Sequence, residues 1–351
     1  MKRKDENYTN CYEMVKKSNL FFFIFIGGRG VGKTYSMLRN PYFENKRIMY
    51  VRRTETELKN CCSNIFNPYK KINMNEHINI QIQKVEDSAV INDCTNEEDI
   101  KVIGYASALS TFGKFRGADF SDVDLIVFDE FINTSLYSKM DNECMMLFNF
   151  IETVNRNREL EGEDSIKVVL LSNSNSIDND IIRTLGLAEV IHNMKMKDEH
   201  FYQDEDRGIF LNLIENKEVQ DLKMETKLYR LARGTTFYDM ALDNEFTRDY
   251  FGDVGKVDYR ELVPICSFEN YYIYEHKSND VLFISKRKAN CPSYNIQNLK
   301  AFKRAYGFKI MWYIDCGYAF YSDYGTKLSF LQIMKGNNLW VNMVDMFQEN
   351  F

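Results

Sequence analysis

A glycine-rich segment directly follows an apolar run near the start of the chain, and this pairing limits the possible folds more than any other feature. The apolar run is Leu20–Ile26, which predicts a buried strand, and a helix is expected to start within Thr34–Arg39. The residues of the segment are Gly27, Gly28, Arg29, Gly30, Val31, Gly32, Lys33 and Thr34. They match the GxxxxGK[ST] pattern in the strand–loop–helix context that this pattern requires. The sequence therefore predicts a phosphate-binding loop, the Walker A motif.

The residue types of this loop indicate what it binds. Backbone N–H groups of such a loop face phosphates at a helix N-terminus, and glycines let the backbone turn tightly and approach the ligand. We expect Lys33 to neutralise the β- and γ-phosphates and Thr34 to hold Mg²⁺. A glycine-rich turn with a chance Lys-Thr is the alternative, but the flanking strand argues against it. ATP and Mg²⁺ are therefore the expected cofactors.

A second apolar strand ends in two acids. The expected strand Asp124–Phe128 runs into Asp129 and Glu130, as in a Walker B motif. From the end of its strand, Asp129 is expected to anchor Mg²⁺. Glu130 is expected to orient or deprotonate the attacking water. An apolar strand ending in Asp-Glu is weak evidence alone, but it gains weight after a phosphate-binding loop in an α/β pattern.

Three polar residues later in the chain have two interpretations each. Asn173 follows the buried strand Ile166–Leu171 and could sense the γ-phosphate or position water, or it could cap a helix. Arg156 and Arg158 lie near the end of a helix expected over Asp141–Glu159. Either arginine could reach a neighbouring subunit's γ-phosphate as a finger, or both could simply be solvated at a helix C-terminus, where cations are favoured.

Further basic residues are open to more than one interpretation. We place Arg53 with the nucleotide-binding residues, although Arg52 and Arg53 could also merely cap the second strand. Lys114 and Arg116 could face a phosphate or the next subunit, or lie on a surface turn. Lys59, in the loop after the second strand region, is the candidate for contact with DNA in a pore, and an exposed helical lysine is its alternative.

Strands and helices alternate through the first part of the chain, which favours an α/β fold. We expect a parallel sheet of the P-loop (RecA, additional-strand) type with helices on both faces, and a smaller α+β domain after it. The expected domains are an ATPase domain at 1–200, a linker or helical region at 201–245 and a C-terminal domain at 246–351. The segment 85–100 is expected to be an acidic loop.

Composition excludes several classes of protein. The net charge of −6 is not that of a histone-like protein coated in positive charge, although a local basic loop could still bind nucleic acid. The longest apolar run is Leu20–Ile26, much shorter than the roughly 20 residues of a membrane span. The 8 cysteines form no CxxC pair and the 4 histidines lack zinc-finger spacing, so reduced thiols and no structural zinc are expected.

Taken in order, these motifs resemble those of the genome-packaging ATPase (encapsidation protein) of small, short-tailed, protein-primed phages. The segments that carry the resemblance are Tyr50–Arg53 (YVRR), Ile126–Phe131 (IVFDEF), Thr153–Glu159 (TVNRNRE), Leu171–Asn173 (LSN), Gly234-Thr235 and Met240–Phe246. They cover most of residues 20–250.

The resemblance implies a ring-shaped ATPase, typically of five subunits, that pumps double-stranded DNA into a viral procapsid. It implies docking at the portal vertex in the host cytoplasm, no membrane, and in some members a structural RNA. It also implies that Arg156 acts in trans on a neighbour's ATP, with Arg158 as the near alternative.

The related large terminases join a similar ATPase to an RNase H-like nuclease, which needs several carboxylates converging on two metal ions. Here the expected strands Val281–Ile284 and Ile310–Ile314 yield one well-placed acid, Asp315. We therefore expect an RNase H-like shape without cutting activity. The alternatives are a terminase large subunit with an active metal-dependent nuclease, and a nucleotide-binding switch without motor activity.

Overall fold

A computed structural model describes residues 8–115, 117–132, 140, 142–173, 179–235, 238 and 253–336. The chain divides into two compact units. The first comprises Met1–Ile181 and Met194–Arg248, and the second comprises Ile182–Asn193 and Asp249–Phe351. Among the described helices, none has both the length and the apolar character needed to cross a membrane.

The first unit is built on a nine-stranded sheet in the order β3-β4-β5-β2-β6-β7-β1-β9-β8. The strands are β1 (Phe22–Gly27), β2 (Ile48–Arg52), β3 (Ile80–Val85), β4 (Ser88–Asp93), β5 (Lys101–Ala108), β6 (Leu125–Asp129), β7 (Lys167–Ser172), β8 (Phe201–Asp204) and β9 (Ile209–Ile214). The six central strands from β5 to β9 in this order pair in parallel. The pairs β3–β4, β4–β5 and β8–β9 are antiparallel, so the sheet is mixed.

The central strands are buried on both faces, as their continuous apolar sequences predict. Every residue of β1 and β6 is buried, and so are the last five of β7. On one face, Phe23 and Phe25 of β1 share a hydrophobic cluster with Met37 and Leu38 of the following helix. The phosphate-binding loop therefore starts from the rigid middle of the sheet.

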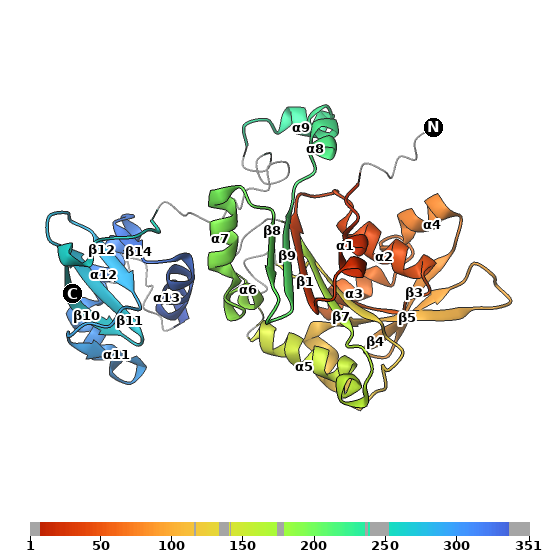
Figure 1. The fold of residues 1–351 in the computed structure, drawn as a ribbon, viewed down its shortest axis with the longest axis horizontal. Coiled ribbons are helices and arrows are strands. Elements are labelled where there is room, and N and C mark those ends of the chain that lie inside the picture. Colours follow the sequence, from red (N-terminus) through yellow and green to blue (C-terminus); the bar gives the residue numbers. More distant parts are fainter. Residues whose placement is uncertain are drawn as a thin grey trace. The chain divides into compact units, whose positions relative to one another are not determined.

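Helices cover both faces of this sheet (Figure 1). The elements are α1 (Cys11–Lys17), α2 (Lys33–Phe43), α3 (Glu55–Cys61), α4 (Lys70–Glu76), η1 (Leu109–Phe115), α5 (Glu143–Asn155), η2 (Arg158–Glu161), α8 (Lys217–Met224) and α9 (Lys227–Leu231). The connection from β1 to β2 and the connection from β6 to β7 cross the sheet in opposite directions. Right-handed crossovers therefore put α2 and α5 on opposite faces.

The second unit contains a five-stranded sheet in the order β13-β10-β11-β12-β14. Its strands are β10 (Leu262–Phe268), β11 (Tyr271–His276), β12 (Leu282–Ser285), β13 (Ser293–Tyr294) and β14 (Ala319–Tyr321). The remaining elements are α6 (Asp180–Thr184), α7 (Leu187–Lys197), η3 (Tyr259–Glu261), η4 (Ile296–Asn298), α11 (Leu299–Phe302), η5 (Lys303–Gly307), α12 (Phe308–Asp315) and α13 (Tyr324–Gly336). The division between the units cuts α6 and α7. In the core, Phe268 stacks on Phe302 with ring centroids 4.3 Å apart.

The expected α/β class is confirmed, with a parallel centre flanked by helices and a smaller domain with its own sheet, although antiparallel strands at both edges make the main sheet mixed. Three local expectations differ from the structure. Residues 201–214, expected in a linker or helical region, form β8 and β9 of the main sheet. The expected loop at 85–100 contains β4, whose Ala89 and Ile91 are buried. The expected strand Ile310–Ile314 belongs to α12, so Asp315 ends a helix instead of a strand.

Candidate functional site

The loop between β1 and α2 has the backbone conformation that its glycines predict. Gly30 and Gly32 have positive φ values of 69° and 104°. Gly32 is also tightly covered, because a Cβ there would lie 2.9 Å from the Cβ of Tyr8 and 3.0 Å from the carbonyl oxygen of Thr9. Only glycine combines this conformation with this close approach.

Lys33 is buried at the base of the loop. Its Nζ donates hydrogen bonds to the carbonyl oxygens of Gly27 and Gly28, both at 2.8 Å, and to Oδ1 of Asn173 at 3.2 Å. Burial lowers the pKa of Lys33 to about 8. Its ammonium group is thus held by neutral oxygens in the place where the motif would put phosphate oxygens.

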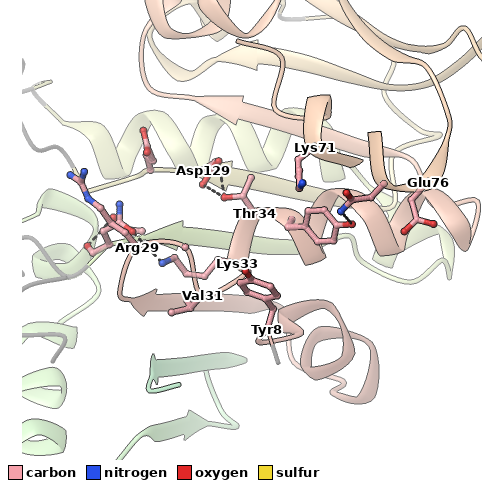
Figure 2. A pocket seen from close by; sticks show the side chains of 15 residues that line it. Tyr8, Arg29, Val31, Lys33, Thr34, Lys71, Glu76 and Asp129 are labelled. Atoms are coloured by element: carbon pink, nitrogen blue, oxygen red, sulfur yellow. Dashed lines mark hydrogen bonds between the residues drawn. The ribbon is translucent and has the colours of Figure 1, made fainter. Parts of the chain in front are cut away.

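Thr34 and Asp129 meet across the sheet edge (Figure 2). The Thr34 hydroxyl donates to the two carboxylate oxygens of Asp129 at 3.0 and 3.1 Å. The hydroxyl of Tyr50, in β2, donates to the same carboxylate at 3.0 Å. Burial raises the pKa of Asp129, against the attraction of the Arg52 guanidinium.

A hydroxyl and a carboxylate are the oxygen ligands that Mg²⁺ prefers, so Thr34 and Asp129 fit the metal expected from the sequence. Elsewhere, within the described part of the chain, no group of three or more His, Cys, Asp or Glu side chains comes together as a metal site.

Glu130 follows β6 with a positive φ of 55°, which is uncommon for a residue other than glycine. Its carboxylate is held by Arg52, whose Nη2 donates to Oε2 at 2.6 Å. Nη1 of Arg52 also lies 3.7 Å from Oδ2 of Asp129. Arg52 therefore links the two acids at the end of β6.

Lys33, Thr34, Asp129 and Glu130 line one pocket of about 870 Å³. Its lining comprises Tyr8, Arg29, Gly30, Val31, Gly32, Lys33, Thr34, Tyr35, Lys71, Asn75, Glu76, Asp129, Glu130, Ser172 and Asn173. Lys71 and Glu76 come from α4, on the far side of Thr34 from the loop (Figure 2). The pocket is large enough for a nucleotide, because small-molecule sites measure roughly 300–1,000 Å³.

The structure does not bring Arg53 to this pocket. Arg53 is 2% exposed and forms a bidentate pair with Glu143 at the start of α5, at 2.7 and 3.3 Å. Consecutive residues at a strand end point to opposite faces, so Arg52 faces the acids while Arg53 faces α5. The sequence-based assignment of Arg53 to nucleotide binding is corrected to a buried link between β2 and α5.

Arg156 and Arg158 lie at the opposite edge of the sheet from the pocket. Arg156, directly after α5, donates a hydrogen bond to the carbonyl oxygen of Ala118. Arg158 donates to the carbonyl oxygens of Ser121 and Val123, at 2.6 and 2.7 Å. These acceptors precede β6, whereas the pocket lies where β6 ends. The two arginines are therefore separated from their own chain's pocket by the length of a strand.

Of the other basic candidates, one lies away from the pocket and two have side chains that the structure does not describe. Lys59 is exposed on α3, a helix and not a loop. Lys114 belongs to η1, but its side chain is not described, and Arg116 lies outside the described residues.

Sequence reasoning missed Tyr50, which reaches the pocket's carboxylate, and Tyr8, Lys71, Asn75 and Glu76, which line the pocket. Tyr50 lies in β2, and the only signal for it was that β2 and β6 are both buried strands. Their adjacency, with Tyr50 paired to Val127, is visible only in the sheet.

Comparison with known proteins agrees with this arrangement. A family model described as "Podovirus DNA encapsidation protein (Gp16)" matches residues 4–285. The chain belongs to this family. The resemblance predicted from the motifs is thereby confirmed.

Two relatives of the Gp16 family illustrate the distance between members. The DNA packaging protein of Bacillus phage B103 is 30% identical over 229 residues, which are 64% of this chain and 64% of that protein. The DNA packaging protein of Bacillus phage phi29 is 28% identical over 247 residues, 69% of this chain and 67% of that protein. The matches thus span about two thirds of the length of these relatives.

Solved structures share the Gp16 fold over nearly the whole chain. "The Phi-28 gp11 DNA packaging Motor" has a TM-score of 0.62 and 20% identity, covering 97% of this chain and 99% of that one. "The bacteriophage Phi-29 viral genome packaging motor assembly" has a TM-score of 0.62 and 19% identity, covering 95% and 99%. At this identity the likeness is one of fold.

Proposed function

We propose that this chain is an ATPase of a ring-shaped motor that drives double-stranded DNA into a viral procapsid. One observation carries the catalytic part of this proposal, namely that Lys33, Thr34, Asp129 and Glu130 line a single pocket at the end of the parallel strands. Membership in the Gp16 family and the packaging proteins among its relatives support the DNA-packaging part.

In the proposed reaction, backbone N–H groups of Gly30–Lys33 receive the phosphates at the start of α2. Lys33 exchanges its bonds to the Gly27 and Gly28 carbonyl oxygens for bonds to the β- and γ-phosphates. Thr34 and Asp129 would hold Mg²⁺, which would neutralise charge on the phosphates. Asn173, already bonded to Lys33, lies where it can contact the γ-phosphate or the attacking water.

Glu130 is the proposed general base. Because its carboxylate is bonded to Arg52, this role requires a change of side-chain conformation. The carboxylate of Glu130 is held and oriented by its pair with Arg52 at 2.6 Å. Water activation then requires that Glu130 turns from Arg52 toward the γ-phosphate. Because Glu130 is over half exposed, its side chain has room for this rotation.

The active site is proposed to be completed by a neighbouring subunit. Arg156 lies at the far end of α5 from its own pocket, as described above, which supports action in trans. Arg158 is held by two backbone carbonyl groups, so Arg156 is the better candidate for the finger. The proposed assembly is a ring, expected to be a pentamer, docked at the portal vertex in the host cytoplasm, with a structural RNA as a further possible component.

The test is DNA-stimulated ATP hydrolysis and DNA packaging into purified procapsids by wild-type protein and by Glu130→Gln. The amide keeps the shape of Glu130 but cannot accept the water proton. The variant is expected to retain ATP and to lose both hydrolysis and packaging. Normal hydrolysis by Glu130→Gln would refute the assignment of the base.

The same preparation distinguishes the alternatives. ATP binding without DNA-stimulated hydrolysis would favour a switch without motor activity. Metal-dependent nicking of a plasmid that disappears in Asp315→Ala would favour a terminase large subunit with an active nuclease.

A further inference from the structure

α8 brings a cation to the phosphate-binding loop from outside the sequence motif. The Nζ of Lys223 donates a hydrogen bond to the backbone carbonyl oxygen of Arg29. Its Cε and Nζ both lie 3.7 Å from the position that a Cβ on Gly30 would occupy. Gly30 and Arg29 line the pocket. The ammonium group of Lys223 therefore lies against the loop, in contact with two residues that line the pocket.

Several contacts fix α8 in this place. Oδ1 of Asn216 caps the helix by accepting from the N–H of Val219 at 3.0 Å, and its Nδ2 donates to the hydroxyl of Thr9 at 3.2 Å. The N–H of Thr9 in turn donates to the carbonyl oxygen of Val31 in the loop at 2.9 Å. Nζ of Lys223 also lies 5.6 Å from the centre of the Tyr229 ring. The start of α8 is thus linked to the loop through Thr9, and its last turn contacts the loop through Lys223.

Arg29 and Lys223 bring positive charges to the loop that no ion pair in the described part of the chain offsets. Arg29, Lys33 and Lys223 gather at one loop, and among the residues that the structure describes no Asp or Glu forms an ion pair with Arg29 or Lys223. Burial lowers the pKa of Lys223, and the nearby Arg29 lowers it further. A cluster of cations in a cleft attracts a polyanion and holds it more tightly than a single charge does. A triphosphate is such a ligand.

We propose that Lys223 is a phosphate-binding residue of the nucleotide site, contributed in cis by α8. Its ammonium group exchanges the bond to the Arg29 carbonyl oxygen for a bond to a phosphate oxygen when a nucleoside triphosphate enters. This inference rests on the proposed nucleotide site and adds a residue that no motif includes. It also couples α8 to the nucleotide, because the contact made by the last turn of the helix, at Lys223, then changes when the ligand binds.

The experiment measures binding of an ATP analogue with a γ-thiophosphate, in Mg²⁺, by calorimetry. Lys223→Met keeps a flexible aliphatic side chain and removes the charge, so the fold should be retained. A lost charge-assisted hydrogen bond predicts affinity reduced by about tenfold or more. Lys223→Arg keeps the charge and should bind within about twofold of wild type. The matched control is Lys227→Met, which removes an exposed lysine from α9 and should leave the affinity unchanged.

Hydrogen exchange gives a readout independent of affinity. In the wild type, the amides of α8 should exchange more slowly with saturating analogue than without it. This protection should be lost in Lys223→Met. Equal affinity of Lys223→Met and Lys227→Met, or unchanged α8 protection in Lys223→Met, would overturn the inference. Failure of the nucleotide site itself is distinguishable, since the wild type would then show no binding that depends on Lys33.

Discussion

Lys33 combines burial with a positive charge, so we expect binding at the proposed nucleotide site to depend on pH. Its pKa is lowered to about 8 by burial. A bound phosphate favours the charged form and raises that pKa again. Near pH 8, binding should therefore take up protons, and affinity should fall as the pH rises through that value. Calorimetry at pH 8 in two buffers of different ionisation enthalpy measures this uptake. Lys33→Ala should abolish the binding, and binding without proton uptake would contradict the expected titration.

The Tyr50 hydroxyl is expected to orient the carboxylate of Asp129 for the metal. Tyr50 is 1% exposed, and its hydroxyl donates to Asp129 at 3.0 Å. Tyr50→Phe removes this bond and little else, so the carboxylate is held by fewer partners. We expect the Mg²⁺ concentration for half-maximal nucleotide binding to rise about tenfold or more, in line with one hydrogen bond to a charged group. Thermal unfolding serves as the control for folding, and an unchanged Mg²⁺ requirement would exclude the positioning role.

The residues of the site that sequence could predict are those within local motifs. Lys33, Thr34, Asp129, Glu130 and Asn173 all line the pocket, because each is fixed by its position after a buried strand. The sequence could not distinguish Arg52 from Arg53. Arg52 ends β2 and Arg53 follows it, and only the placement of β2 between β5 and β6 decides which one faces the acids.

At the scale of elements, prediction succeeded for the central strands and failed where local pattern is weak. β1, β6 and β7 are continuous apolar runs, typical of strands covered on both faces. The run Ile310–Ile314 has the same appearance but lies in α12, since an apolar run of this length does not distinguish a strand from a buried helix turn. The strand β4 was not predicted, because the acidic residues around it favour a loop, although it pairs with both of its neighbours.

The loop between β1 and α2 is an element that tolerates little change. Gly32→Ala would force a Cβ to within 2.9 Å of the Tyr8 Cβ at a φ of 104°. We expect a loss of about 1–3 kcal/mol in the free energy of unfolding, together with weaker nucleotide binding. Gly113→Ala is the matched control, because a Cβ there has no heavy atom within 4 Å. Denaturant unfolding of both variants measures the difference, and equal stability would mean that the N-terminal segment moves aside without cost.

At the scale of the whole molecule, the parallel sheet separates two halves of the proposed chemistry. Its carboxyl edge holds Lys33, Asp129 and Glu130, and its amino edge holds Arg156 after α5. The strands between these edges are five or six residues long, which is roughly 17–20 Å. No side chain spans this length, so a chain in this conformation cannot apply Arg156 to its own nucleotide. This separation supports the proposal that a second copy supplies that arginine.

Mixed assemblies test this division between subunits. An arginine finger is worth a factor of about 10³–10⁵ in rate, so Arg156→Ala should be nearly as inactive as Glu130→Gln. When the two variants are mixed, some interfaces pair the intact Glu130 of an Arg156→Ala subunit with the intact Arg156 of its Glu130→Gln neighbour. Those interfaces should recover DNA-stimulated ATP hydrolysis that neither variant shows alone. If Arg156 acts in cis, every subunit carries its own defect and mixing restores nothing. Recovery with Arg158→Ala but not with Arg156→Ala would assign the finger to Arg158, and full activity of Arg156→Ala alone would refute action in trans by this residue.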